Sequence, residues 1–116
     1  IFQHFQNRFR NRKKEHVVAL LLDGKNRVIR EVAISEGSLN QSIVHPRELF
    51  NPAVRDSAAA IIVVHNHPTG DPTPSREDME LTRRLKEAGE LMGIKVLDHV
   101  IIGDVGYVSF ADMGML

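Results

Sequence analysis

The chain has 116 residues, with 15 basic and 15 acidic residues and no cysteine. A chain of this length forms one domain, which buries about two thirds of the surface that its unfolded form exposes. The balanced charge argues against a dedicated nucleic-acid binder, and the lack of cysteine excludes disulfides, cysteine zinc fingers and thiol nucleophiles from this chain.

The sequence also carries information on membrane association, on the cellular compartment and on the start of the chain. No apolar run reaches membrane-spanning length and no signal peptide is visible, so we expect no membrane association. The lack of cysteine fits a reducing compartment, and we expect a cytoplasmic protein. Because the chain begins at Ile1, we expect it to be a fragment of a longer protein.

A basic lead segment, residues 1–14, precedes the main domain, which we predict at residues 15–116. Phe2, Phe5 and Phe9 recur at helical spacing and predict a short helix that docks its aromatic side. The segment contains no acidic residue, and its basic residues are Arg8, Arg10, Arg12, Lys13 and Lys14. Basic residues beside aromatic ones can contact DNA, so DNA binding through residues 1–14 is an alternative to a solvated basic face.

The next stretch predicts a β-hairpin. Val17–Leu22 is a continuous apolar run typical of an interior strand, and Arg27–Ile34 alternates well enough to be its antiparallel partner. Asp23–Asn26 supplies the turn residues between them.

A helix is predicted from the segment after residue 44. Pro46 suits the first position of a helix, and Pro52 predicts a break at Asn51, followed by a second short turn to Asp56. His45, at the start of this helix, is expected to cap or to pack rather than to face a functional site.

The apolar run Ala58–Val64 predicts a buried strand that is stopped by Pro68 and Gly70. Side chains alternate along a strand, so His65 and His67 project to the same face, about 6.5 to 7 Å apart along it. Two imidazoles placed in this way can converge on one cation.

A helix start follows a stiff, proline-rich loop. Ser75 suits the N-cap, and Asp78 then occupies the third helical position, where its carboxylate faces back along the incoming chain toward the histidines. Taken alone, Ser75 and Asp78 also fit a simple capping box.

Two imidazoles and one carboxylate, with a fourth position left for water, form a ligand set of hydrolytic zinc enzymes. We therefore predict one Zn²⁺ ion held by His65, His67 and Asp78. The nitrogen and oxygen donors do not exclude iron, manganese or cobalt. A buried strand should not otherwise end in two desolvated imidazoles.

The rest of the chain predicts a long helix and two strands. The helix, Arg76–Met92, ends at Gly93, and its inward stripe is predicted to contain Met79, Leu81, Thr82, Leu85, Ala88 and Met92. The strands are Ile94–Gly103 and Tyr107–Phe110. His99 lies inside the first of these strands, either as a structural histidine or as a group supporting the site or facing the substrate.

The spacing His65-Asn66-His67, seven residues, Ser75, two residues, Asp78 resembles the JAMM motif, His-x-His-x7-Ser-x2-Asp, of the JAB/MPN/Mov34 metalloprotease superfamily. The segments GSLNQSIVHPRE, VVHNHPTGDPTPSRED and LDHVIIGD resemble the bacterial RadC branch, whose members are named as DNA repair proteins. The resemblance covers roughly Glu15 to Phe110. It implies an α/β fold with a cytidine deaminase-like mixed β-sheet flanked by helices, and a helix-hairpin-helix region before residue 1 that could contact DNA.

The resemblance also implies roles for single residues. Glu15, which stands before the first strand, corresponds to the general base of the superfamily, and Glu36 is the rival candidate. Ser75 corresponds to the residue that hydrogen-bonds the oxyanion.

Together the residues and the resemblance predict a zinc-dependent hydrolase that cleaves an amide, peptide or isopeptide bond of a protein or peptide substrate. Zinc deaminases of nucleobases need a P-C-x-x-C signature, and thermolysin-like proteases need H-E-x-x-H; both patterns are missing. The alternative is a DNA-associated or scaffold module that has a metal site and no peptidase activity.

Overall fold

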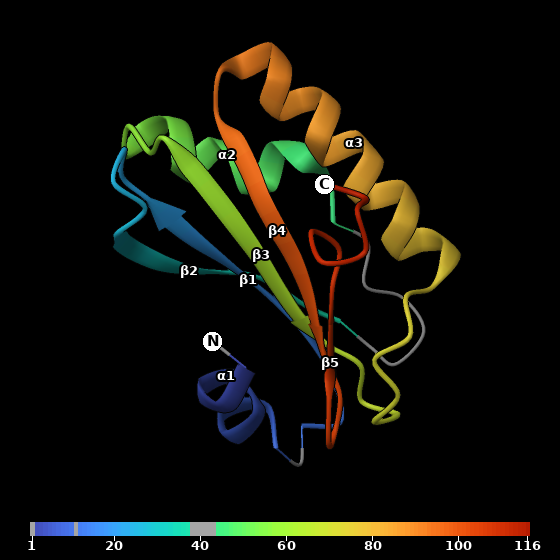
Figure 1. Ribbon diagram of the computed structural model, residues 1–116. Helices are drawn as coiled ribbons and strands as arrows, with labels where there is room; N and C mark the ends of the chain where they lie inside the picture. Colours follow the sequence, from blue (N-terminus) through green and yellow to red (C-terminus); the bar gives the residue numbers. More distant parts are fainter. Residues whose placement is uncertain (1, 11, 38–43) are drawn as a thin grey trace.

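A mixed β-sheet forms the centre of the computed structural model, which describes residues 2–10, 12–37 and 44–116 (Figure 1). Its strand order is β2-β1-β3-β4-β5. The strands are β1 Glu15–Leu22, β2 Val28–Gly37, β3 Ala60–Asn66, β4 Lys95–Ile102 and β5 Tyr107–Ser109, and the helices are α1 Phe2–Phe9, α2 Pro46–Arg55 and α3 Arg76–Met92. The β3 and β4 strands are parallel, whereas the other neighbours are antiparallel. The predicted α/β fold with a mixed sheet flanked by helices is confirmed.

The helices lie on both faces of the sheet. Figure 1 shows α2 and α3 on one face and α1 on the other. Alternation along β1 explains the two layers, because successive side chains of a strand point to opposite faces. Val17, Ala19 and Leu21 belong to the core cluster shared with α2 and α3, whereas Val18 and Leu20 belong to the cluster shared with α1.

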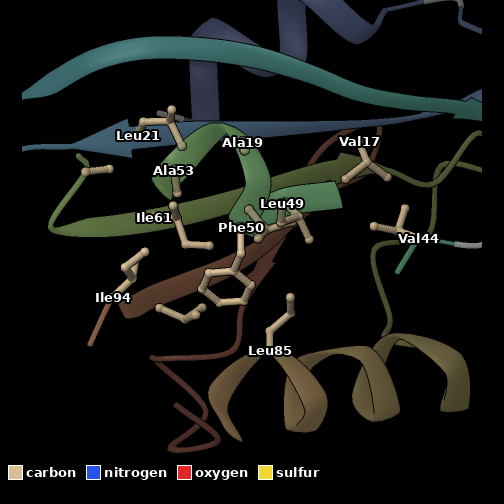
Figure 2. Packing of buried hydrophobic residues seen from close by; sticks show 13 residues of the cluster. Val17, Ala19, Leu21, Val44, Leu49, Phe50, Ala53, Ile61, Leu85 and Ile94 are labelled. Carbon is tan, nitrogen blue, oxygen red and sulfur yellow. The ribbon is translucent and has the colours of Figure 1, made fainter. Parts of the chain in front are cut away.

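The larger core lies between the sheet and helices α2 and α3. Figure 2 shows Leu49, Phe50 and Ala53 of α2 directed toward the strands, with Leu85 of α3 close to Phe50. These four side chains are almost completely buried. Fully burying a large apolar side chain stabilises a fold by about 1.5–3 kcal/mol, so this layer holds α2 and α3 against the strands.

The first helix docks through its aromatic side, as predicted. Phe5 and Phe9 are buried and pack against β1, β3 and β4. The lead segment therefore covers one face of the sheet in the structure. The division into residues 1–14 and 15–116 stays a prediction.

The predicted break in α2 is wrong, because α2 runs without interruption from Pro46 to Arg55. Pro52 has no N–H and therefore removes the helical hydrogen bond to the carbonyl of Glu48. Burial of Phe50 and Ala53, on either side of the proline, opposes a break because both side chains must face the core. His45 caps the helix as expected, since its Nδ1 accepts a hydrogen bond from the Arg47 N–H at 3.1 Å.

The bounds of α3 agree with the prediction, but part of its predicted inward stripe is wrong. Met79 and Met92 are 43% and 47% exposed. The buried face instead contains Asp78, Thr82, Leu85 and Gly89. Gly89 explains the difference, because a Cβ atom there would lie 2.5 Å from the carbonyl oxygen of Ile94. The helix approaches Ile94 through this glycine, so the face that contains Gly89 packs inward; Met79 lies outside that face, and Met92 is the last residue of the helix.

The helices are too short or too polar to span a membrane in the part of the chain that the structure describes.

Candidate metal centre

Three elements meet where β3 ends. The antiparallel register pairs Val17 of β1 with His65 of β3, so Glu15, at the start of β1, lies beside the end of β3. A turn then leads from His67 toward α3, with the Gly70 N–H bonded to the His67 carbonyl at 2.9 Å. Asp78 lies in the first turn of α3 and is buried.

The side chains of His65, His67 and Asp78 converge. The two Nε2 atoms of the histidines are 3.2 Å apart. The Nε2 of His65 lies 3.2 Å from Asp78 Oδ1, and the Nε2 of His67 lies 2.9 Å from Asp78 Oδ2. With one carboxylate oxygen of Glu15, the candidate ligand atoms all lie within 4.8 Å of one another.

These separations fit a small tetrahedral cation. Four ligands at about 2.0–2.1 Å from zinc lie about 3.3 Å from one another at the corners of a tetrahedron. The histidine and aspartate atoms are 2.9 to 3.2 Å apart. The donors are nitrogen and oxygen atoms, which suit zinc and several other divalent metals. The cluster could therefore hold one metal ion, whose identity the geometry does not specify.

The ring of His67 is oriented for such a role. Its Nδ1 lies 2.9 Å from the carbonyl oxygen of Asp71, which can only accept a hydrogen bond. Nδ1 therefore carries a hydrogen, and in the neutral ring Nε2 keeps a free lone pair. This lone pair is directed at the centre of the cluster.

The charges of the cluster influence one another. Burial disfavours the carboxylate of Asp78, but its close contacts with the rings of His65 and His67 outweigh burial and hold the pKa of Asp78 far below its usual range. For His67 burial lowers the pKa, and the bonds to Asp78 and Asp71 overcome it, so that the pKa is raised. In the absence of a metal the aspartate is therefore anionic and pairs with His67.

Glu15 lies at the edge of the cluster, with Oε1 3.4 Å from His65 Nε2 and a side chain that is 17% exposed. Burial raises the pKa of Glu15, and the neighbouring His65 partly offsets that effect. A carboxylate in this position could be a proton acceptor or a further metal ligand.

Glu36, the rival candidate base, lies outside the cluster. Its register partner on β1 is His16, so it points to the face opposite Glu15. Its side chain is 55% exposed and lies 3.6 Å from the ammonium group of Lys14. Of the two glutamates, only Glu15 reaches the histidines.

Ser75 caps α3 in a reciprocal capping box. The hydroxyl oxygen accepts a hydrogen bond from the Asp78 N–H at 3.1 Å, and the Ser75 N–H donates to Asp78 Oδ2 at 2.8 Å. Accepting a bond occupies an oxygen lone pair and leaves the hydroxyl hydrogen free to donate. The capping role and a role as a donor to substrate are therefore compatible.

Sequence reasoning missed two buried polar residues that support the cluster. Asn66 accepts a hydrogen bond from the His16 N–H at 2.6 Å and donates to the Lys14 carbonyl at 3.1 Å, so it holds the backbone on both sides of Glu15. Thr82 of α3 contacts His99 of β4, with 2.5 Å between its hydroxyl oxygen and the His99 Nδ1. A threonine four residues after Asp78 in an otherwise apolar helical stripe was the available signal.

The cluster opens into a cavity of about 390 Å³. Its walls combine Glu15, His65 and Asp78 with the apolar side chains of Val17, Val44 and Leu81. A substrate could therefore reach the cluster along a partly apolar surface.

Comparison with known proteins identifies the family of this chain. A family model described as "RadC-like JAB domain" matches residues 1–115. The chain belongs to the RadC-like JAB domain family.

Relatives of this RadC-like domain cover its full length. A UPF0758 protein of Geotalea uraniireducens is 70% identical over 116 residues, which are all of this chain and 51% of the relative. A UPF0758 protein of Geobacter sulfurreducens is 68% identical over the same length and the same share. A UPF0758 protein of Methanococcoides burtonii is 57% identical over 94% of this chain and 48% of its own length. The chain thus spans about half the length of these relatives.

Proposed function

We propose that this RadC-like domain is a zinc-dependent hydrolase that cleaves an amide bond, peptide or isopeptide, in a protein or peptide substrate. The observation that supports the proposal is the convergence of two Nε2 atoms and one carboxylate, with Glu15 beside them. We assign His65, His67 and Asp78 as the metal ligands. A bound zinc ion would lower the pKa of a water molecule and polarise the carbonyl group of the substrate.

The protein side chains supply the proton transfers. Glu15 accepts a proton from the attacking water and delivers it to the leaving amine. Its burial and its raised pKa favour this exchange, because a base that becomes protonated more easily also holds the proton until it passes to the nitrogen of the leaving amine. The Ser75 hydroxyl donates a hydrogen bond to the oxygen on which negative charge develops.

The proposal is tested by comparing two glutamine variants. The purified domain, prepared without chelator, is expected to contain about one zinc per chain by elemental analysis. Glu15→Gln should keep the zinc and lose about 10²–10⁴-fold of the hydrolysis rate on a mixed peptide and isopeptide library read by mass spectrometry. Glu36→Gln, the matched control, should change neither quantity.

Two results would contradict these assignments. Wild-type protein without zinc argues against the metal site as a whole. Loss of zinc from Glu15→Gln shows that Glu15 is a fourth ligand, in which case the site is closed and its role as base is wrong.

A second candidate function, DNA association without hydrolysis, is favoured by a separate groove. A cavity of about 800 Å³ is bordered by His67, Asp104 and the basic side chains of Arg10, Arg12 and Lys13. Within the described residues, none of these three cations forms an ion pair with a carboxylate. Such a groove could contact a phosphate backbone, although the domain as a whole has no net charge.

DNA association predicts a salt-dependent affinity. The triple variant Arg10→Gln/Arg12→Gln/Lys13→Gln removes three cationic side chains that could contact phosphates. It should reduce the slope of log affinity against log salt concentration by about 3. The control Lys25→Gln/Arg55→Gln/Lys86→Gln changes exposed cations elsewhere and should leave the slope unchanged. Fluorescence anisotropy with a short duplex measures both, and a flat salt response of the wild type removes this candidate.

A further inference from the structure

We infer that His99 and Thr82 are positioning residues, which hold His65 in the tautomer that presents a free Nε2 lone pair to the metal. The inference deepens the proposed function and rests on its metal site. It concerns atoms that lie behind the cluster and touch neither substrate nor metal.

The ring of His99 fills a closed position on β4. It is 0% exposed and stacks on Phe110 at 4.6 Å, with 8° between the ring planes. The parallel register pairs His99 with Val63, two residues before His65, so both histidines point to the same face of the sheet. The Nε2 of His99 lies 2.8 Å from the Nδ1 of His65.

The direction of the hydrogen bonds follows from Thr82. Its hydroxyl has one hydrogen, which it donates to the carbonyl oxygen of Asp78 at 3.0 Å. The same oxygen lies 2.5 Å from the Nδ1 of His99 and must therefore accept a hydrogen bond from it.

The hydrogen-bond direction at Thr82 also fixes which nitrogen carries hydrogen in His99 and then in His65. The His99 ring is 0% exposed, and its hydrogen-bond partners are the uncharged Thr82 hydroxyl and the His65 ring rather than a carboxylate, so we take it as neutral, with hydrogen on only one nitrogen. With hydrogen on Nδ1, its Nε2 must accept, and the only remaining donor for the 2.8 Å contact is the Nδ1–H of His65. A neutral His65 then has no hydrogen on Nε2, the atom that faces the cluster.

The opposite direction replaces the Thr82 bond to the Asp78 carbonyl with one from His65 Nε2 to Asp78 Oδ1, 3.2 Å away, and so leaves no lone pair for a metal. If Thr82 donated to His99, the Asp78 carbonyl would lose that hydrogen bond. His65 would then carry hydrogen on Nε2 and would have to lose it before binding a metal. His67 at 2.9 Å and the Ser75 N–H at 2.8 Å both bond Oδ2 of Asp78, so Oδ1, which lies 3.2 Å from His65 Nε2, would face the metal.

This series of hydrogen bonds also connects β3 and α3, the elements that carry the proposed metal ligands His65 and Asp78. It runs from His65 on β3 through His99 on β4 to Thr82 and Asp78 on α3. A ligand ring with its second nitrogen bonded in this way has a set orientation and a more basic donor atom. Loss of such a partner typically weakens metal affinity by about 10–100-fold.

The experiment combines a tautomer measurement with zinc affinities. Nitrogen-15 NMR of the histidine rings in metal-free wild type is expected to show hydrogen on Nδ1 and none on Nε2 of His65. Competition against a chelator of known affinity then gives the zinc Kd of each variant. The exposed His4 provides a control, since His4→Gln should leave the Kd unchanged.

Four variants separate the hydrogen bond from packing. His99→Phe keeps a ring against Phe110 but offers no acceptor, and should weaken zinc binding about 10–100-fold. His99→Gln offers an amide oxygen to His65 and should recover most of this loss. Thr82→Val removes the hydroxyl and should have an intermediate Kd, whereas Thr82→Ser should match the wild type.

The outcomes distinguish this inference from the proposed function. Hydrogen on Nε2 of His65 in metal-free wild type overturns the inference, as does an unchanged Kd in a folded His99→Phe. If His99→Phe does not fold by circular dichroism, the Thr82→Val and Thr82→Ser pair decides, and equal Kd values overturn it. Wild type that binds no zinc contradicts the proposed function, while the NMR spectrum still tests the tautomer.

Discussion

Asn66 separates the two histidines along the chain, and its side chain extends the pairing of β1 with β3. The backbone register between these strands ends at Val17 and His65. Beyond that pair, the Asn66 amide accepts from the His16 N–H and donates to the Lys14 carbonyl, as a peptide group of the next ladder position would. A single side chain thereby places Glu15 beside the histidines.

Substitution of Asn66 should therefore lower the stability of the fold and displace Glu15, the proposed base. Asn66→Ala leaves the partly buried His16 N–H and the Lys14 carbonyl without these partners, and should lower the free energy of unfolding by about 0.5–1.5 kcal/mol. Zinc content should persist while the hydrolysis rate falls, because the ligands stay in place and Glu15 does not. Urea unfolding, elemental analysis and the peptide assay measure the three quantities. Asn51→Ala, at an exposed position of α2, is the control; an equal effect of both substitutions contradicts the proposed role of Asn66.

The hairpin between β1 and β2 is an element encoded by its own turn. Asp23 Oδ1 accepts hydrogen bonds from the Lys25 N–H at 2.9 Å and the Arg27 N–H at 3.0 Å. Asn26 has a φ angle of 61°, a left-handed conformation that asparagine tolerates better than most residues. The turn residues therefore account for the predicted hairpin without reference to the rest of the fold.

The same turn predicts a pH dependence of stability. Hydrogen bonds from the Arg27 and Lys25 backbone hold the pKa of Asp23 below the usual value of an aspartate. A lowered folded-state pKa stabilises the protein above the unfolded-state pKa, and this stabilisation is lost as the pH falls through the folded-state value. The Tm difference between wild type and Asp23→Ala should thus be larger at pH 7 than at pH 3. Thermal unfolding checks this, with the exposed Asp112→Ala as control; a difference that is constant or grows toward acid contradicts the prediction.

The candidate metal centre brings together residues that are distant along the chain. Glu15, the histidines and Asp78 come from β1, the end of β3 and α3. A metal ion held there would bind the folded chain and not the unfolded one, because the unfolded chain does not bring these groups together.

Zinc should consequently raise the thermal stability. Free zinc at 100 times its Kd adds about 2.7 kcal/mol, which for a chain of this size corresponds to an increase in Tm of about 10 °C. Chelator should reverse the increase, and His67→Ala should abolish it. Differential scanning calorimetry with and without zinc measures the shift; an equal shift in wild type and His67→Ala would show that zinc binds elsewhere.

Much of the fold follows from short-range patterns. The apolar runs and turn residues predicted the hairpin and β3, and Ser75 and Gly93 predicted both ends of α3. The break at Pro52 and the inward Met79 and Met92 were wrong, because burial of neighbouring residues and the close approach at Gly89 override local preference.

The candidate site divides in the same way. The spacing of His65 and His67 on a strand, and of Ser75 and Asp78 at a helix start, expresses backbone periodicity and capping within a few residues, so it could be recognised directly from the amino acids. The partners of these groups could not be found in that way. Glu15 reaches the cluster and Glu36 does not because of the register between strands, and Thr82 and His99 meet only when α3 packs on β4. These contacts depend on packing between elements far apart in the chain, which no local pattern encodes.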